Sequence, residues 1–174
     1  MKERGLVHVY TGNGKGKTTA ALGLALRASG HGKKVYIVQF MKGRIDYGEL
    51  KACKDSPNIT IEQFGRPQFV NKDNPEPEDL EYAKDALSRA KEVLQSGEYN
   101  IVILDEINLA ADFNLIDLEN VLELVNEKPE EVELILTGRN ANPEIVKIAD
   151  YVTEMLEIKH PYKEGQVGRK GIEF

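Results

Sequence analysis

The sequence has few of the features on which secreted and membrane proteins depend. It contains a single cysteine, Cys53, so no disulfide can form within the chain, as is usual for proteins of the reducing cytoplasm. No apolar run approaches the roughly 18 residues that cross a bilayer, and the N-terminus lacks the apolar stretch of a signal peptide. We therefore expect a cytoplasmic protein with no membrane partner.

Basic charge and catalytic histidine clusters are also scarce. The formal net charge is −6, whereas a general nucleic-acid surface requires a basic field, so we expect no nucleic-acid partner. His8, His31 and His160 lie in unrelated contexts, and neither a Ser-His-Asp nor a Cys-His arrangement is evident. This favours a protein that positions reactants and stabilises charge over one that forms a covalent intermediate.

What the sequence does have is the patterning of one α/β domain over residues 1–174. Hydrophobic residues make up 41% and charged residues 30%, an ordinary globular composition. Short β-branched runs alternate with helical patterns, which is typical of a mostly parallel sheet flanked by helices on both faces. Strands are expected at residues 6–10, 35–40, 59–64, 101–104, 132–136 and 151–158. Helices are expected at 16–29, 77–96, 115–126 and 143–149, with a loop at 66–76 and an irregular C-terminal tail at 160–174.

The segment Val9–Thr19, VYTGNGKGKTT, carries the strongest functional signal. It lies between a predicted strand and a predicted helix, which is the context of a phosphate-binding P-loop, so we predict a P-loop (RecA-like) domain. Glycines in such a loop let backbone N–H groups surround phosphate oxygens, and the helix N-terminus adds its partial positive charge. Lys17 would contact the phosphates, and the Thr18 hydroxyl would bind Mg²⁺.

The spacing of this loop departs from the usual G-x-x-x-x-G-K-[ST] pattern. That pattern would place the first glycine at position 11, where the chain has Thr11, and the nearest glycine is Gly12. The loop is therefore either one residue shorter than usual or begins with a non-glycine residue. Both arrangements change where the phosphates sit, so ordinary ATPase geometry is not assumed.

Charged residues at the ends of two later strands are candidate partners of the loop. Asp105 and Glu106 follow the apolar run at 101–104, where P-loop proteins bring a carboxylate to the metal. Because strand residues alternate faces, we expect one acid to face the metal and the other to hold a neighbouring loop. Arg139 follows the strand at 132–136 and is either a phosphate ligand or a surface arginine. Arg27 could reach the ligand or cap its own helix, and both remain open.

Seven short motifs occur in an order that resembles one known family. They are 9–21, VYTGNGKGKTTAA; 38–43, VQFMKG; 104–107, LDEI; 137–139, TGR; 149–155, ADYVTEM; 159–161, KHP; and 171–174, GIEF. Together they resemble the P-loop type of ATP:corrinoid adenosyltransferase, which includes the cob(I)alamin and cob(I)yrinic acid a,c-diamide adenosyltransferases. The resemblance runs from about residue 6 to the C-terminus. The short loop is itself a hallmark of this family, which accounts for the unusual spacing.

The resemblance implies a reaction that spacing alone does not. The family transfers the 5′-deoxyadenosyl group of ATP to the Co(I) centre of a corrinoid, forming a cobalt–carbon bond and releasing triphosphate. ATP lies in the loop in the opposite direction to that in other P-loop proteins. By position, the implied ATP-binding residues are Gly12, Asn13, Gly14, Lys15, Gly16, Lys17, Thr18, Thr19, Arg27 and Arg139. Thr18 and Glu106 are implied to bind Mg²⁺ or Mn²⁺, and Lys17 and Arg139 to stabilise the leaving triphosphate.

The resemblance also implies an apolar site that receives the corrinoid and favours loss of its lower axial ligand. Phe69, in the loop GRPQFV, matches an aromatic residue with this role, although it could simply pack on the domain. The chain has no tryptophan, and Asn71 stands where some members carry a second aromatic residue. Longer members cover the site with an N-terminal segment, so we expect the C-terminal tail to take more of that role here.

The implied partners are ATP, a corrinoid (cobalamin, cobinamide or cobyrinic acid a,c-diamide), a reductant protein that supplies electrons, and a second copy in a homodimer. Two other function classes compete with the adenosyltransferase. One is a P-loop phosphotransferase or NTPase, such as a nucleoside kinase, and the other is a nucleotide-dependent binding module without turnover. The product distinguishes the first two, because adenosyl transfer yields triphosphate and phosphoryl transfer yields ADP.

Overall fold

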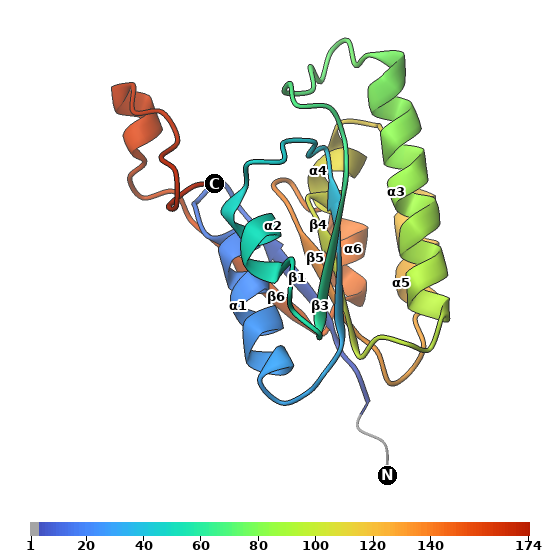
Figure 1. Ribbon diagram of the computed structural model, residues 1–174. Helices are drawn as coiled ribbons and strands as arrows, with labels where there is room; N and C mark the ends of the chain where they lie inside the picture. Colours follow the sequence, from blue (N-terminus) through green and yellow to red (C-terminus); the bar gives the residue numbers. More distant parts are fainter. Residues whose placement is uncertain (1–3) are drawn as a thin grey trace.

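A six-stranded, wholly parallel β-sheet forms the centre of the molecule in the computed structural model, which describes residues 4–174 (Figure 1). The strand order is β3-β2-β4-β5-β1-β6. The strands are β1 (Val7–Thr11), β2 (Val35–Phe40), β3 (Ile59–Phe64), β4 (Ile101–Asp105), β5 (Glu133–Thr137) and β6 (Tyr151–Glu154). The predicted α/β class with a parallel sheet is confirmed.

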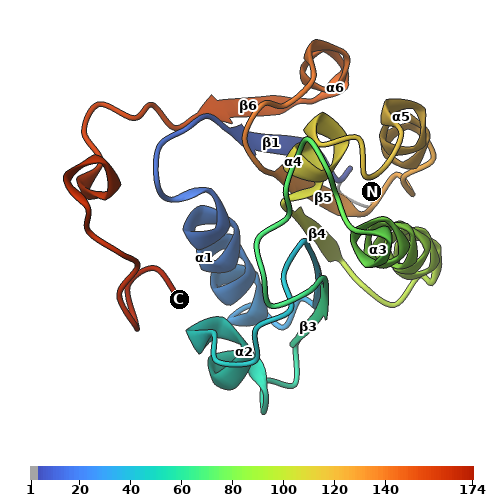
Figure 2. The ribbon, with the colours of Figure 1, turned by 90° about the horizontal axis from the view of Figure 1, so that it is seen from above.

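Helices cover both faces of the sheet. They are α1 (Lys17–Ser29), α2 (Gly48–Cys53), α3 (Pro77–Gln95), α4 (Ile107–Asp112), α5 (Leu118–Asn126) and α6 (Pro143–Ile148), with a 3₁₀ turn η1 at Pro161–Glu164. Viewed from above, α1 and α2 lie on one face and α3, α4, α5 and α6 on the other (Figure 2). No helix within residues 4–174 is long and apolar enough to cross a membrane.

Strand residues supply the core on each face by alternation. Ile37, Ile103 and Ile135 point toward the alanines of α1 and form one buried cluster. Their neighbours Val38 and Leu104 belong to the other cluster, which packs against α3, α4 and α5. Every residue of β2 and β4 is buried, because a central parallel strand is covered on both faces. This burial explains why these two strands read as nearly continuous apolar runs.

Most predicted elements are present, with differences at their ends. The strands at 35–40 and 59–64 match the prediction to the residue, whereas the last strand ends at Glu154 and not at residue 158. The helix expected from residue 115 begins at Leu118, after Asp117 in extended conformation. The short helices α2 and α4 were not predicted, and the tail expected to be irregular contains η1. Six residues are too few to show a helical period.

All six strands end at the same edge of the sheet. In a parallel sheet the segments that follow the strands therefore converge there, which is where open α/β sheets bind ligands. The segments after β1, β2, β4 and β5 carry the phosphate loop, Lys42, Glu106 and Arg139, respectively. The sheet thus gathers residues that are more than 120 positions apart in the sequence.

Shortening a buried side chain at the centre of the sheet should destabilise the protein. Leu104 is fully buried, so we expect Leu104→Ala to lower the free energy of unfolding by about 2–5 kcal/mol through lost burial and a residual cavity. Leu26 on α1 is 71% exposed, and Leu26→Ala should change stability by no more than about 0.5 kcal/mol. Urea unfolding followed by circular dichroism measures both. Equal losses in the two variants would contradict the assigned core.

Candidate active site

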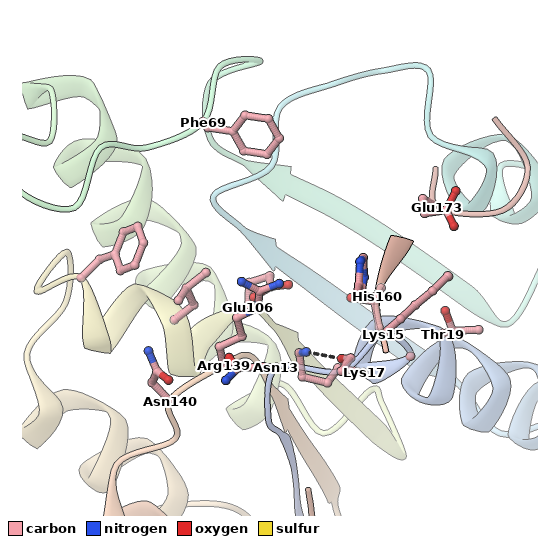
Figure 3. Close-up of a pocket in the computed structure, with 15 residues that line it drawn as sticks. Asn13, Lys15, Lys17, Thr19, Phe69, Glu106, Arg139, Asn140, His160 and Glu173 are labelled. Atoms are coloured by element: carbon pink, nitrogen blue, oxygen red, sulfur yellow. Dashed lines mark hydrogen bonds between the residues drawn. The ribbon is translucent and has the colours of Figure 1, made fainter. Parts of the chain in front are cut away.

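A cavity of about 600 Å³ opens at the carboxyl edge of the sheet. The phosphate loop and the start of α1 form one wall, through residues 13–19. The other lining residues come from five further segments and are Phe69, Glu106, Leu109, Phe113, Arg139, Asn140, His160 and Glu173 (Figure 3). Charged groups lie beside the loop, and the apolar side chains come from α4 and from the loop after β3.

The phosphate loop is the shorter of the two forms that the spacing left open. β1 continues through Thr11, which pairs with Glu154 of β6, so the turn begins at Gly12. Gly12 and Gly16 have φ angles of 92° and 123°, a region that glycine enters without steric cost. α1 then begins at Lys17, with its unpaired N–H groups at the cavity. The loop therefore has the backbone that phosphate binding requires.

The chain that follows β6 holds the loop in place. Gly14 N–H donates to the Met155 carbonyl at 2.7 Å. A Cβ atom on Gly14 would lie 2.7 Å from the carbonyl oxygens of both Met155 and Leu156, and one on Gly12 would lie 2.5 Å from that of Met155. Side chains at these two positions would push the loop away from its support. The glycines are thus needed for close backbone packing as well as for turning.

Lys17 lies inside the loop. Its side chain is largely buried, and its Nζ donates to the carbonyls of Gly12 at 2.7 Å and Gly14 at 2.8 Å (Figure 3). Burial lowers the pKa of Lys17, while the nearby Glu106 opposes this shift. The ammonium group is therefore held at the inner surface of the loop, where phosphate oxygens would bind.

Asp105 connects four segments around the cavity. It is almost fully buried. Its Oδ1 accepts hydrogen bonds from Thr18 at 2.8 Å and Thr137 at 2.7 Å, and its Oδ2 accepts from Gln39 at 3.1 Å and Lys42 at 2.6 Å. Burial by itself would raise the pKa of Asp105, but Lys42 and the threonine hydroxyls hold it below its usual value. The carboxylate is therefore ionised, with both oxygens already engaged.

Glu106 differs from Asp105 in its backbone conformation, its hydrogen bonding and the direction of its pKa shift. Its backbone is left-handed, with φ 66°, and its side chain lines the cavity while Oε2 is buried without a hydrogen-bond partner. Burial and the adjacent Asp105 raise the pKa of Glu106. The prediction from strand alternation does not apply as stated, because β4 ends at Asp105 and Glu106 lies in the left-handed turn that precedes α4.

These residues fit a divalent metal. The unpartnered Glu106 oxygen offers one ligand atom, and Thr18 offers another because its hydroxyl proton is directed at Asp105 and its lone pairs remain free. Residues 4–174 contain no cluster of three or more histidine, cysteine or acidic side chains that could hold a metal unaided. Mg²⁺ commonly binds through one or two carboxylates plus substrate phosphates, which suits this donor set.

The structure brings most of the predicted residues together but not all. Residues 13–19, Glu106, Arg139 and Phe69 line the cavity, and Gly12 contacts Lys17. Arg27 is the exception. It lies in the last turn of α1 and is not among the residues that line the cavity, so its contact with ATP stays a prediction.

The apolar part of the cavity contains residues that the sequence analysis missed. The predicted Phe69 is fully exposed, and the missed residues are Leu109 of α4 and Phe113, which directly follows that helix. The Phe113 N–H donates to the Leu109 carbonyl at 2.9 Å, so the two residues lie one helical turn apart. The unpredicted α4 concealed this signal, because the pair is recognisable only once a helix is known to follow Glu106.

Polar contacts hold the loop that carries Phe69 at both ends. Arg66 forms two hydrogen bonds with the buried Asp79 of α3, at 2.8 and 2.7 Å. Lys72 binds Asp112 of α4 at 2.8 Å and lies over the Phe113 ring, with its Nζ 5.4 Å from the ring centre. The loop thus places Phe69 on the same side of the cavity as α4.

The C-terminal tail leaves the sheet after β6 and then turns back, so that the C-terminus lies near α1 and α2 (Figure 1). Lys15 Nζ donates to the Ile172 carbonyl at 3.1 Å, so its side chain extends toward the segment that carries Glu173 (Figure 3). Glu173 and His160 line the cavity. The guanidinium carbon of Arg44, in the segment between β2 and α2, lies 4.8 Å from the centre of the Phe174 ring. The tail therefore contacts both the phosphate loop and the segment between β2 and α2.

The sequence matches the model of the family ATP:corrinoid adenosyltransferase BtuR/CobO/CobP over residues 3–174. The chain belongs to the ATP:corrinoid adenosyltransferase family. It is 37% identical to a corrinoid adenosyltransferase of Escherichia coli (strain K12), over 99% of this chain and 87% of the relative. It is 35% identical to the corrinoid adenosyltransferase CobA of Salmonella typhimurium, over 100% of this chain and 88% of the relative. A corrinoid adenosyltransferase of Sinorhizobium sp is 37% identical, over 99% and 81%.

Adding a methyl group to the phosphate loop should weaken nucleotide binding. In Gly14→Ala the new Cβ would collide with two backbone carbonyls, so we expect at least about a tenfold loss of ATP affinity, or about 1.4 kcal/mol. Gly23→Ala is the matched control, because nothing lies within 4 Å of its Cβ and alanine favours a helix interior by about 0.5–1 kcal/mol. Isothermal titration calorimetry would show unchanged ATP affinity in the control. An equal affinity in Gly14→Ala would contradict the observed packing.

Removing the charge of Glu106 should stabilise the metal-free protein in a pH-dependent way. Because its pKa is raised in the folded state, the stability that this group contributes is present at low pH and is lost as the pH rises through the raised pKa. The melting temperature of Glu106→Gln minus that of the wild type should therefore increase as the pH is raised from about 4 to about 8. The exposed Glu81→Gln on α3 serves as the control. A melting-temperature difference that decreases with rising pH would contradict the raised pKa of Glu106.

Proposed function

We propose that this protein transfers the 5′-deoxyadenosyl group of ATP to the Co(I) centre of a corrinoid. In this reaction the cobalt forms a bond to carbon 5′ of the ribose, the bond between that carbon and the phosphate oxygen breaks, and inorganic triphosphate leaves. The observation that carries the proposal is a single cavity with a short phosphate loop on one side and an apolar wall on the other. Membership of the adenosyltransferase family supports the same reaction.

The chain's own charged groups would stabilise the leaving triphosphate. Lys17 is already directed at the inside of the loop, and Arg139 lines the same cavity. Backbone N–H groups of the loop and of the first turn of α1 add further donors. A Mg²⁺ or Mn²⁺ ion held by Thr18 and Glu106 would supply additional positive charge to the phosphates. Catalysis then rests on positioning and charge stabilisation, since Co(I) is itself a strong nucleophile and needs no protein base.

The apolar wall would receive the corrinoid. Phe69, Leu109 and Phe113 could cover the macrocycle and exclude water from the lower face of the cobalt. Such exclusion would favour loss of a lower axial ligand and make the cobalt easier to reduce. Candidate substrates are cobalamin, cobinamide and cobyrinic acid a,c-diamide, and a cytoplasmic reductant protein would supply the electrons. A homodimer is also part of the proposal.

The C-terminal tail would cover the bound nucleotide. It is tethered to the loop through Lys15 and to the segment between β2 and α2 through Phe174. Glu173 adds a carboxylate that must share the cavity with an anionic ligand. Arg169 holds this carboxylate with two side-chain hydrogen bonds and one backbone hydrogen bond. Neutralisation by Arg169 would let the tail lie over the phosphates.

An assay of the reaction products distinguishes adenosyl transfer from the alternative, a phosphotransferase or NTPase. The purified protein is mixed with ATP, Mg²⁺ and chemically reduced cobalamin, and both products are assayed. We expect a light-sensitive alkyl-cobalt spectrum and one triphosphate for each adenosyl group transferred. Formation of ADP without a cobalt–carbon product would identify phosphoryl transfer, and binding without any product would identify a binding module.

Lys17→Ala should abolish adenosyl transfer and leave the fold intact. The loss of the buried ammonium removes a charge from the leaving group, so we expect kcat/KM to fall by at least about a hundredfold, or about 2.7 kcal/mol of transition-state stabilisation. The exposed Lys84→Ala on α3 removes the same charge outside the cavity and serves as the control. Steady-state assays together with thermal melting separate lost chemistry from unfolding. Transfer at the wild-type rate in Lys17→Ala would rule out this mechanism.

A further inference from the structure

Lys42 is a largely buried cation that pairs with Asp105, and the proposed reaction does not use it. It follows β2 by two residues, after a reversal at Met41 with φ 57°. A Cβ atom on Gly43 would lie 2.0 Å from the Gly65 carbonyl oxygen, and one on Gly65 would lie 2.5 Å from the backbone nitrogen of Lys42. The chains after β2 and β3 therefore cross in direct backbone contact. This crossing fixes the position from which the Lys42 side chain extends.

The ammonium group of Lys42 forms an ion pair with Asp105. Its Nζ is 2.6 Å from Asp105 Oδ2, and only 16% of its side chain is exposed. Asp105 Oδ1 is occupied by the hydroxyls of Thr18 and Thr137. Lys42 also interacts electrostatically with Glu106 and with Glu49 of α2. A single lysine thus interacts with three carboxylates, two from adjacent residues at the end of β4 and one from α2.

Without this lysine, the same carboxylates would form a cation site. Asp105 and Glu106 are adjacent, Thr18 adds a hydroxyl oxygen, and one oxygen of Glu106 has no partner. Hard divalent cations favour such oxygen donors. With Lys42 present, only Glu106 and Thr18 remain available, too few to hold Mg²⁺ without phosphate oxygens.

We propose that Lys42 is an internal counter-ion that occupies the cation position on Asp105, so that the divalent metal enters only together with the nucleotide. It is a positioning residue, because it acts through Asp105 and does not touch the substrate. The inference rests on the proposed metal-binding role of Thr18 and Glu106. Its consequence is ordered binding: the empty cavity is neutralised by the chain itself, and the phosphates supply the ligands that the metal lacks.

Titration of Mn²⁺ followed by electron paramagnetic resonance tests this directly. Free Mn²⁺ is measured against the wild type and Lys42→Gln, each with and without ATP. Glutamine retains a hydrogen-bond donor for Asp105 but carries no charge. We expect Lys42→Gln without ATP to bind Mn²⁺ at least about tenfold more tightly than the wild type does, because the competing charge is gone. Lys42→Arg should behave as the wild type does.

Two further variants show whether the gained site involves Asp105. In Lys42→Gln/Asp105→Asn the gained Mn²⁺ affinity should disappear, because the freed carboxylate is removed. Lys91→Gln is the control for loss of a lysine in an ion pair, since Lys91 binds Glu123 on the outer surface of α3 and α5. It should leave Mn²⁺ binding unchanged. Thermal melting checks that each variant is folded, and Lys42→Met, which has a similar length, replaces the glutamine variant if that one is unfolded.

The possible results separate this inference from the proposed function. If the wild type with ATP shows no saturable Mn²⁺ binding beyond that of ATP alone, the metal role of Thr18 and Glu106 fails. If the wild type with ATP binds Mn²⁺ but a folded, charge-free Lys42 variant gains no affinity without ATP, the counter-ion inference is overturned. Tight Mn²⁺ binding by the wild type without ATP would overturn it as well.

Discussion

The buried carboxylate of Asp105 is the interaction on which the rest of the site depends. A charge at that depth is tolerated only when it is paired and fully hydrogen-bonded. Four donors meet the requirement, and they come from the start of α1, from β2, from the segment after β2 and from β5. The need to satisfy one carboxylate thus holds the phosphate loop in register with three other segments. It also leaves the neighbouring Glu106 as the acid that is free to act.

Backbone contacts, more than side chains, shape the rest of the cavity. The phosphate loop rests on the carbonyls of Met155 and Leu156, and the ends of β2 and β3 cross at Gly43 and Gly65. Both contacts are closer than a Cβ atom would allow. The glycines therefore let the phosphate loop rest on the chain after β6, and let the chain after β2 rest on the chain after β3. A side chain at these positions would push the packed segments apart.

The division of the cavity into a charged side and an apolar side matches the two substrates of the proposed reaction. A triphosphate needs fixed donors and positive charge, whereas a corrinoid macrocycle needs apolar surface that excludes water. In the proposed reaction Lys17 and Arg139 would serve the first need, and Phe69, Leu109 and Phe113 would serve the second, since all five line the same cavity. Because both sets belong to segments that leave one edge of a parallel sheet, the fold would place the two substrates side by side without a separate domain.

Local pattern determined the P-loop class, the central strands, the loop residues 12–19, Glu106 and Arg139, because each depends on neighbours close in the sequence. The family assignment also followed from motif order. Tertiary structure alone decided that Asp105 is saturated while Glu106 is open, that Lys15 reaches the tail, and that Phe113 joins Phe69. These outcomes depend on where distant segments meet, and no sequence spacing encodes that distance.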